Sequence, residues 1–357
     1  MPYQLYLQAG AWIPCSGFFS EDSGFSGSSG DSGITVFRRF RGANEKRRKM
    51  EKFEVTILGC GSALPTLRHL GTAQVVDIRN KYFLVDCTEG VQLALRRNRI
   101  NLNRINTVLI SHLHGDHCFG LVGYVSTMAL LGRKAPLHVY GPKDLEKVFR
   151  PQIAYFCSGM EYEVVFHEVD TTKAAVIYED RSLSIESIPL HHRVACCGYC
   201  FREKQGRPHM RHGVIDRYGI PYSQVNNIKA GQDFMTADGV MVPHTELTTP
   251  PAPARSYAFC SDTAYLPAIA DQLKGVDLLY HEATYGEDNT ELAARYCHST
   301  ARQAAMIAKA AGAGKLIIGH YSQRYDDEQV LLREAQEVFP ETILAEEGKS
   351  IEVRSKR

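Results

Sequence analysis

The sequence predicts an α/β protein whose functional site lies at one edge of a sheet. Short apolar runs typical of buried strands alternate with segments that favour helices. Polar side chains follow four of these runs at the same offset of two residues: His112 after Ile110, His192 after Leu190, Asp262 after Cys260 and His320 after Ile318. The carboxyl ends of neighbouring strands meet at one sheet edge, where α/β proteins place their sites. We therefore expect these four side chains to converge.

Composition restricts the class of protein further. The chain has 357 residues, 44% of them hydrophobic, which suffices for one large domain or two ordinary ones. The net charge is +1, so a nucleic-acid surface would have to be a local patch. Ten cysteines show no disulfide or zinc-ribbon spacing, and we interpret Cys196, Cys197 and Cys200 as reduced packing residues of a cytoplasmic protein. No apolar run is long enough to span a membrane.

Residues 1–49 differ in composition from the rest. Ser16–Gly33 is rich in Ser, Gly and Asp, and a basic run follows over Arg38–Arg48. Such composition resists ordering, and Met50 stands just before the first good strand. We expect a disordered or mis-annotated leader, with the functional domain over residues 50–357; a basic RNA-binding arm is the alternative. Mass spectrometry of the native protein tests whether translation starts at Met50, and abundant peptides from residues 1–49 would contradict it.

The first half of the domain predicts strands joined by turns and helices. Gly59–Ser62 contains a Gly-x-Gly turn, which alone is weak evidence for phosphate binding, and we expect no nucleotide cofactor. The alternation over the second and third strands is typical of a hairpin. In order, we expect strands at Val55–Leu58, Gln74–Ile78, Tyr82–Val85, Val108–Ile110 and Leu137–Tyr140, with helices at Gly90–Arg97, Leu121–Leu131 and Asp144–Arg150.

The second half predicts four more strands around a long insertion. Residues 202–255 are polar and rich in Gly and Pro, which is typical of a loop. Thr300–Ala311 is rich in alanine and favours a helix. The expected strands are Leu183–Ile188, Ser256–Cys260, Val276–Tyr280 and Lys315–Ile318.

The segment at 111–117, S-H-L-H-G-D-H, carries the strongest chemical signal. Alternate residues of an extended segment share a face, so His112 and His114 could bind one ion. Gly115 permits a sharp change of direction, after which Asp116 and His117 could face a second ion. Imidazole and carboxylate both suit zinc. A polar loop with incidental histidines is the alternative.

The chain resembles the metallo-β-lactamase superfamily, and specifically its tRNA 3′-processing branch, ribonuclease Z. The resemblance covers residues 50 to about 353. The motifs that carry it are S-H-L-H-G-D-H at 111–117, H-V-Y-G-P at 138–142, P-L-H-H-R-V-A-C-C-G-Y at 189–199, S-D-T at 261–263, H-E-A-T-Y at 281–285, H-S-T at 298–300 and G-H-Y-S-Q-R-Y at 319–325. It implies a four-layer αβ/βα sandwich of two mixed sheets with an inserted flexible arm, and removal of the 3′ trailer from precursor tRNA.

The resemblance also implies a ligand set for two Zn²⁺ ions. One ion would be held by His112, His114 and His192, the other by Asp116, His117 and His320, and Asp262 would bridge both. His191 is the alternative to His192, because adjacent strand residues face opposite ways. We interpret His138 as structural, and His209, His212 and His244 as surface or RNA contacts rather than ligands.

Two catalytic roles follow from the same resemblance. Asp116 is the expected proton acceptor, and His298, with Glu282 nearby, is the expected proton donor to the leaving 3′ oxygen. The alternative for His298 is an ordinary residue before the Ser299-Thr300 helix cap. The alternative for Glu282 is a carboxylate that orients a ligand histidine, which is compatible with the catalytic role.

RNA binding is assigned by position to an arm over Lys204–Gln232. It contains Lys204, Arg207, Arg211, Arg217 and Lys229 against the single acid Asp216, and could make salt-dependent phosphate contacts. It departs from the family in having Ile220-Pro221 where a Gly-Pro turn is usual. The resemblance further implies a homodimer. A small-molecule hydrolase on the same fold and a non-catalytic RNA-binding relative are the alternatives.

Overall fold

The computed structural model describes residues 51–356, so the expectations for residues 1–49 lie outside the described residues. The first of two seven-stranded sheets has the order β18-β1-β2-β3-β4-β5-β6. Strands β1, β2, β3 and β18 pair antiparallel, and β3 to β6 pair parallel. The strands are β1 (Phe53–Gly59), β2 (Ala73–Ile78), β3 (Lys81–Val85), β4 (Ile105–Leu109), β5 (Leu137–Gly141), β6 (Val164–Glu168) and β18 (Ser350–Glu352).

The second sheet has the order β17-β16-β15-β14-β9-β8-β7. Its strands β14 to β17 are parallel, whereas β7, β8, β9 and β14 pair antiparallel. The strands are β7 (Val176–Glu179), β8 (Leu183–Pro189), β9 (Cys197–Glu203), β14 (Ser256–Cys260), β15 (Leu278–Glu282), β16 (Lys315–Gly319) and β17 (Thr342–Leu344). Both sheets are therefore mixed, as the resemblance implies.

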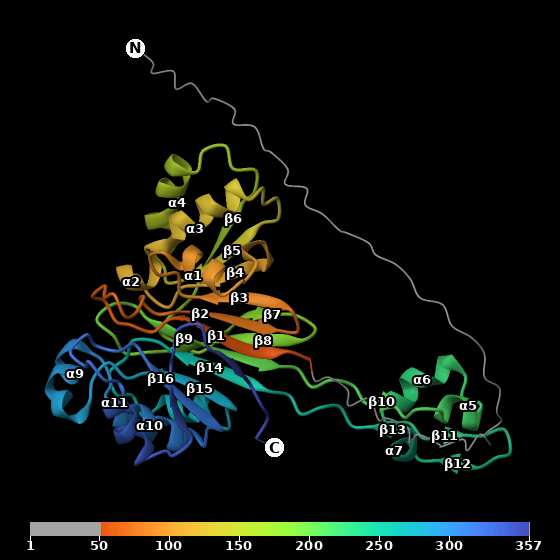
Figure 1. Ribbon diagram of the computed structural model, residues 1–357. Helices are drawn as coiled ribbons and strands as arrows, with labels where there is room; N and C mark the ends of the chain where they lie inside the picture. Colours follow the sequence, from red (N-terminus) through yellow and green to blue (C-terminus); the bar gives the residue numbers. More distant parts are fainter. Residues whose placement is uncertain (1–50, 357) are drawn as a thin grey trace, which may run out of the picture. The chain divides into compact units, whose positions relative to one another are not determined.

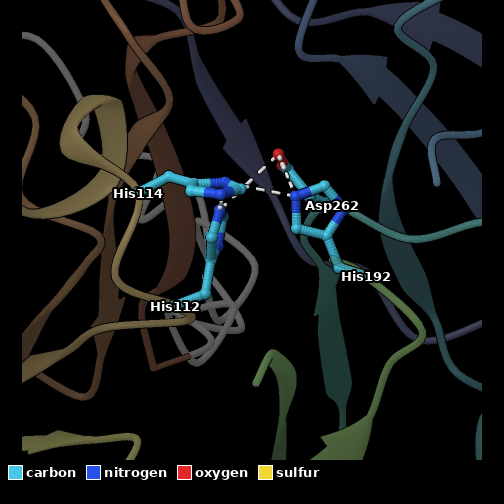
Figure 2. Close-up of side chains that lie close together, drawn as sticks. All are labelled: His112, His114, His192 and Asp262. Carbon is cyan, nitrogen blue, oxygen red and sulfur yellow. Dashed lines mark hydrogen bonds and ion pairs between the residues drawn. The ribbon is translucent and has the colours of Figure 1, made fainter. Parts of the chain in front are cut away.

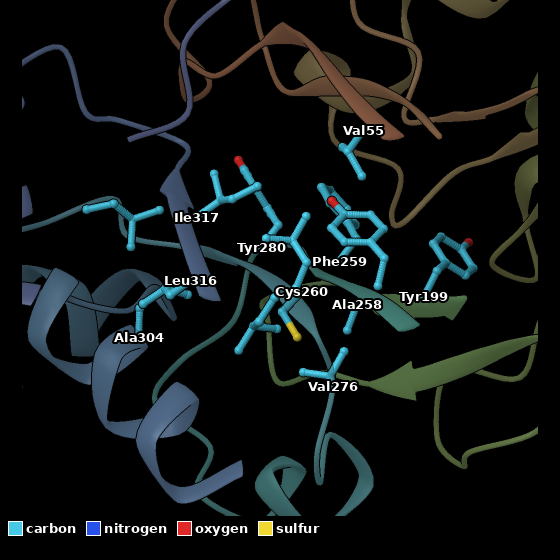
Figure 3. Packing of buried hydrophobic residues seen from close by; sticks show 14 of the residues in the cluster. Val55, Tyr199, Ala258, Phe259, Cys260, Val276, Tyr280, Ala304, Leu316 and Ile317 are labelled. Carbon is cyan, nitrogen blue, oxygen red and sulfur yellow. The ribbon is translucent and has the colours of Figure 1, made fainter. Parts of the chain in front are cut away.

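Helices cover the outer faces of the two sheets (Figure 1). One buried cluster joins the first sheet to α1, α3 and α4, and a larger one joins the two sheets to each other and to α10. Figure 3 shows the larger cluster, in which Val55 of β1 faces Tyr199 and Phe259 of the second sheet. The helices are α1 (Val91–Arg97), η1 (Leu102–Arg104), α2 (Gly115–Cys118), α3 (Gly120–Leu130), α4 (Leu145–Phe156), α8 (Ile269–Gln272), η2 (Glu287–Asn289), α9 (Thr290–Tyr296), α10 (Ala301–Ala311) and α11 (Gln329–Gln336).

Outside the insertion, the sequence located nine of the fourteen described strands and four of the ten described helices, and it misjudged some bounds. It missed the strands β6, β7, β9, β17 and β18. The strand expected at Val276–Tyr280 is β15, which begins at Leu278 and runs on through Glu282. The helix expected to end at Arg150 continues through Pro151 to Phe156. Phe149 and Ile153 are buried on one face of α4, and this packing holds the helix together across the proline.

The insertion contains short helices and strands around a small core of its own. We call residues 204–254 the arm unit. Its core of Val214, Ile220, Ile228, Val242 and Leu247 contains no residue of the other two cores. The predicted arm, Lys204–Gln232, is part of this unit, and the core residues Val242 and Leu247 lie beyond Gln232. The elements are β10 (His209–Met210), α5 (Val214–Tyr218), α6 (Tyr222–Lys229), β11 (Phe234–Met235), β12 (Met241–Val242), α7 (His244–Leu247) and β13 (Thr248–Thr249).

Two further expectations concern the whole described chain. The nine cysteines within residues 51–356 are free. Cys197 and Cys200 are buried in the larger apolar cluster, as expected, whereas the buried Cys196 donates its thiol to the Asp262 carbonyl at 3.4 Å. Among the same residues, every helix is too short or too polar to cross a bilayer.

Candidate metal centre

The segment after β4 bends so that its polar side chains leave the sheet together. His112 and His114 lie in extended chain, and α2 begins at Gly115, which puts Asp116 and His117 in a helical turn. A Cβ at Gly115 would lie 2.3 Å from the exposed Phe119 ring, so a larger residue at this position would have to displace that ring. The predicted change of direction at this glycine is therefore present.

The first cluster joins His112, His114, His192 and Asp262 from three separate segments (Figure 2). His114 Nδ1 lies 3.0 Å from His112 Nε2 and 3.2 Å from His192 Nε2. Asp262 Oδ2 lies 3.6 Å from His112 Nε2 and 3.8 Å from His192 Nε2. Four potential ligand atoms thus surround one point.

The second cluster consists of Asp116, His117 and His320. Asp116 Oδ2 lies 3.2 Å from His117 Nε2 and 3.7 Å from His320 Nε2. Asp262 Oδ1 lies 3.4 Å from His117 Nε2 and 3.2 Å from His320 Nε2. Asp262 therefore turns one oxygen toward each cluster and lies between them.

Four buried polar atoms of this centre have no hydrogen-bond partner in the described part of the chain. They are Asp116 Oδ2, His117 Nε2, Asp262 Oδ1 and His320 Nε2. Leaving a buried polar atom unpaired costs about 1–3 kcal/mol, and four such atoms facing one space would be very unfavourable without an occupant. Nitrogen and carboxylate oxygen donors at these separations fit a divalent cation such as zinc.

Outer hydrogen bonds fix the ring orientation of four histidines. His117 Nδ1 donates to Asp86 Oδ2 at 2.7 Å, and His320 Nδ1 donates to Thr284 Oγ1 at 2.7 Å. His192 Nδ1 donates to the Cys297 carbonyl at 2.9 Å. His112 Nδ1 lies 3.0 Å from Ser111 Oγ, which itself donates to Asp86. In each ring Nδ1 points to an outer partner and Nε2 points to the centre, the arrangement that ligation through Nε2 requires.

Sequence reasoning missed three of these supporting residues. Asp86 accepts from Ser111 N, Ser111 Oγ and His117 Nδ1, and it is completely buried. The sequence did contain a clue to the role of Asp86, because this acidic residue directly follows the strand that ends at Val85. Thr284 and Ser111 are hydroxyl residues whose roles depend entirely on distant neighbours, so sequence offers no comparable signal.

The carboxylates make the centre attractive to cations. Burial lowers the pKa of His117, but the charges of Asp262, Asp116 and Asp86 outweigh this and raise it well above its usual value. Burial works the other way on Asp262, whose pKa is nevertheless lowered by His320, His117 and His112. The pKa of His112 is well below its usual value, because burial disfavours its charged form. A cation that binds here would therefore displace a proton from His117.

His298 and Glu282 form a second pair beside the first cluster. His298 Nδ1 lies 2.9 Å from Glu282 Oε1 and 4.0 Å from Asp262 Oδ2. Burial lowers the pKa of His298, but Glu282 and then Asp262 outweigh it and raise the pKa to about 9. Glu282 is fully buried and also accepts from Thr263 N, Ser299 N and Thr284 Oγ1. Glu282 therefore both stabilises the protonated form of His298 and orients its ring.

A cavity of about 590 Å³ opens beside the centre. Asp116, His114 and Phe119 line one part of it, and Arg193 contributes a cation. Residues from the loop at 62–71 line another part, and Phe119 is 68% exposed. The cavity thus combines an aromatic face, a positive charge and access to the candidate ligands.

The remaining expected site residues lie elsewhere. His191 is exposed and belongs to neither cluster, and His138 contacts His167 at 2.9 Å within the first sheet. His244 pairs with Asp233 at 3.0 Å, and His209 and His212 lie in the arm unit. The five expected RNA-binding residues are Lys204, Arg207, Arg211, Arg217 and Lys229, all of them in the arm unit.

Two of these five basic side chains, Lys204 and Arg211, already have partners within the protein. Lys204 pairs with Glu179 at 2.7 Å. Arg211 donates to the Thr248 and Thr245 carbonyls at 3.0 and 3.2 Å, so it supports the arm unit's fold. Arg211, His212, Arg217 and Tyr218 also line a cavity of about 440 Å³ in the arm unit. Arg207 is exposed at the beginning of the unit.

Two seven-stranded mixed sheets facing each other, with clustered histidine and aspartate side chains at one edge, define a protein of the metallo-β-lactamase fold. The solved structures agree: the short form of human tRNase Z matches with a TM-score of 0.62 and 23% identity, over 84% of this chain and 99% of that one. YhfI from Bacillus subtilis, a metallo-β-lactamase fold protein, matches with a TM-score of 0.58 and 19% identity, over 84% and 99%.

Sequence comparison narrows the class to one family. A protein of Bacteroides thetaiotaomicron named Ribonuclease Z is 52% identical over 306 residues, 86% of this chain and 97% of that protein. A Ribonuclease Z of Phocaeicola vulgatus is also 52% identical, over 86% and 99%. The chain belongs to the ribonuclease Z family. A family model described as anti-Pycsar protein Apyc1 matches residues 53–195, less than half of the chain.

Proposed function

We propose that this protein is a zinc-dependent endoribonuclease that removes the 3′ trailer from precursor tRNA. It leaves a 3′ hydroxyl on the tRNA and a 5′ phosphate on the trailer. Membership of the ribonuclease Z family supports the substrate. The observation that carries the chemistry is the group of four unpaired buried atoms that face one space beside an open cavity.

We assign the centre to two Zn²⁺ ions. His112, His114 and His192 would hold one, Asp116, His117 and His320 the other, and Asp262 would lie between them. When bound, zinc supplies Lewis acidity that neutralises charge on the phosphate and activates water near neutral pH. His192 takes the ligand role rather than His191, because only His192 reaches Asp262 and His114.

The chain's own residues supply the proton transfers. Asp116 lines the cavity and accepts the proton of the attacking water. His298 carries a proton at neutral pH because Glu282 stabilises its charged form, and it donates this proton to the leaving 3′ oxygen. Glu282 holds Nδ1, so Nε2 is the nitrogen that exchanges the proton.

The arm unit is proposed to bind the tRNA away from the reaction. Arg207, Arg217 and Lys229 supply positive charge for phosphate contacts. Lys204, which pairs with Glu179, adds to the positive potential of the unit, and Arg211 stabilises its fold. We also propose a cytoplasmic homodimer. Leu130, Tyr155 and Phe156 are 86%, 79% and 66% exposed at the ends of α3 and α4, and such an apolar surface suits a subunit interface.

One assay tests the activity: zinc-loaded protein is given precursor tRNA and, separately, bis(p-nitrophenyl) phosphate. Trailer release is expected. Cleavage of the small diester alone would indicate a small-molecule hydrolase, and tRNA binding without cleavage would indicate a non-catalytic relative; either result overturns the proposal. A substituted arm unit, with residues 206–252 replaced by a short Gly/Ser linker, should raise KM for tRNA and spare the small diester.

Single substitutions test the assigned roles. Asp116→Ala and His298→Ala should abolish turnover, but His298→Ala should keep both zinc ions by elemental analysis. His192→Ala should lose metal, whereas His191→Ala, its exposed neighbour, is the matched control and should keep it. Metal loss in His298→Ala would make His298 a ligand, and metal loss in His191→Ala would contradict the assignment of His192.

A further inference from the structure

A third group of metal-binding side chains lies outside the candidate metal centre. Cys60, His69 and Glu347 each offer a ligand atom, and these atoms all lie within 4.8 Å of one another. Cys60 follows β1, His69 ends the loop at 62–69, and Glu347 precedes β18. The three residues thus connect a loop beside the cavity to the adjacent strands β1 and β18 at one edge of the first sheet.

The distances match those between ligands of one tetrahedral ion. Cys60 Sγ lies 3.4 Å from His69 Nδ1, and His69 Nδ1 lies 3.7 Å from Glu347 Oε1. With zinc–sulfur bonds of about 2.3 Å and zinc–nitrogen bonds of about 2.0 Å, tetrahedral ligands are separated by about 3.3–3.6 Å. Sulfur, nitrogen and oxygen are all ligands that zinc accepts.

The other nitrogen of His69 is already held by a carboxylate. His69 Nε2 lies 3.1 Å from Glu328 Oε1, which also pairs with Arg68 at 3.2 Å. Metal-binding histidines commonly donate their second N–H to a carboxylate, which fixes the ring and makes the free nitrogen a better ligand. Glu347 is positioned as well, because its Oε1 accepts from Leu70 N at 2.6 Å.

The same group does not suit a nucleophile. A thiol, an imidazole and a carboxylate in series resemble a cysteine-histidine-glutamate triad. However, the Cys60 side chain is fully buried, so a substrate cannot reach its sulfur. Burial and the charges of Glu347 and Glu328 also raise the pKa of the thiol well above its usual value. Those negative charges favour a bound cation instead.

We propose that Cys60, His69 and Glu347 bind a third divalent metal ion, zinc by its ligand preference, with Glu328 orienting His69. This ion is additional to the proposed pair at the candidate metal centre. It would fix the loop at 62–69, whose residues Ser62, Pro65 and Thr66 line the cavity beside that centre. Its role would be to hold one wall of the cavity in place.

Cobalt substitution tests the proposal without reference to activity. The candidate metal centre offers only nitrogen and oxygen ligands, so a thiolate-to-cobalt charge-transfer band in the near ultraviolet reports on a cysteine site alone. The full chain, stripped with chelator and titrated with Co²⁺, should bind three equivalents and show this band. Two equivalents without the band would overturn the proposal, even if both ions of the candidate metal centre are present.

Three variants locate the site. Cys60→Ser and Glu347→Gln should each lose the band and one equivalent; Glu347→Gln keeps an oxygen to accept from Leu70 N. Cys118→Ser is the matched control, because Cys118 is a buried thiol beside the candidate metal centre, where it donates to the His114 carbonyl at 3.1 Å. It should keep the band. Survival of the band in Cys60→Ser, or its loss in Cys118→Ser, would place the cysteine ligand elsewhere.

Discussion

Replacing Glu282 with glutamine tests whether one buried carboxylate keeps His298 protonated. Glu282 is 0% and His298 11% exposed, and the two lie 2.9 Å apart. Water therefore screens their interaction weakly. The pKa of His298 is about 9, against an ordinary value of 6.5. A net difference of this size corresponds to roughly 3 kcal/mol in favour of the charged imidazole. Glu282 makes the largest favourable contribution, followed by Asp262, and both act against the effect of burial.

The expected change follows from the protonated fraction. If Glu282→Gln returns the pKa of His298 to about 6.5, the protonated fraction at pH 8 falls from about 90% to about 3%, whereas at pH 6 it stays above about 70%. The assay is an NMR titration of the imidazole signals in chelated protein, because bound cations would themselves lower the pKa. His298→Gln identifies the signal. For activity, Glu282→Gln should lose more turnover at pH 8 than at pH 6.

The raised pKa of His298 also makes the stability of the folded state depend on pH. A histidine whose pKa is raised by folding stabilises the folded state fully below pH 6.5, and this contribution disappears as pH rises through about 9. Glutamine places an N–H against the donor Thr284 N, 3.0 Å from Glu282 Oε2, so circular dichroism must first show that the variant is folded. A wild-type His298 that titrates near 6.5 would refute the reasoning, whatever the variant does.

Three further predictions concern the metal and the fold. Asp86→Asn should weaken metal binding about 10–100-fold, because Asp86 orients His117; chelator competition measures this, and equal weakening in exposed Asp170→Asn would contradict it. Metal affinity should fall as pH falls, by about tenfold per pH unit for each proton displaced, because His117 binds a proton tightly; pH-independent affinity would contradict it. Glu203→Ala should destabilise by about 3–5 kcal/mol, because it leaves Arg255 buried and unpaired; in chemical unfolding, Glu146→Ala in an exposed pair should cost under about 1 kcal/mol.

Local pattern was enough to predict nine of the fourteen strands in the two described sheets and four of the seven candidate ligands. His112, His114, Asp116 and His117 lie within six residues, so chain geometry alone brings them near one another. Strand-end position was also informative, because His192, Asp262 and His320 do converge on that segment. The resemblance supplied the pairing of these ligands into two clusters, which spacing left open.

Other features depended on neighbours that are distant in sequence. His191 and His192 are adjacent residues of the same type, so residue type does not tell them apart. Only the path of the chain after β8 directs His192 toward Asp262. Thr284 becomes a support of His320 because β15 and β16 run side by side. The arm unit looked like a loop, because its core is assembled from single apolar residues spread over Val214–Leu247 without a helical or strand period.

The sequence by itself determined the class of fold, the segment that carries the metal ligands and the family. Each of these is written in contiguous residues or in motifs that keep their order. Only the tertiary structure decided which atoms stay unpaired, which carboxylates orient the histidines, and that Cys60, His69 and Glu347 meet. The physical reason is that hydrogen bonding and ligation act over about 3 Å in space, whereas these partners are separated by up to hundreds of residues along the chain.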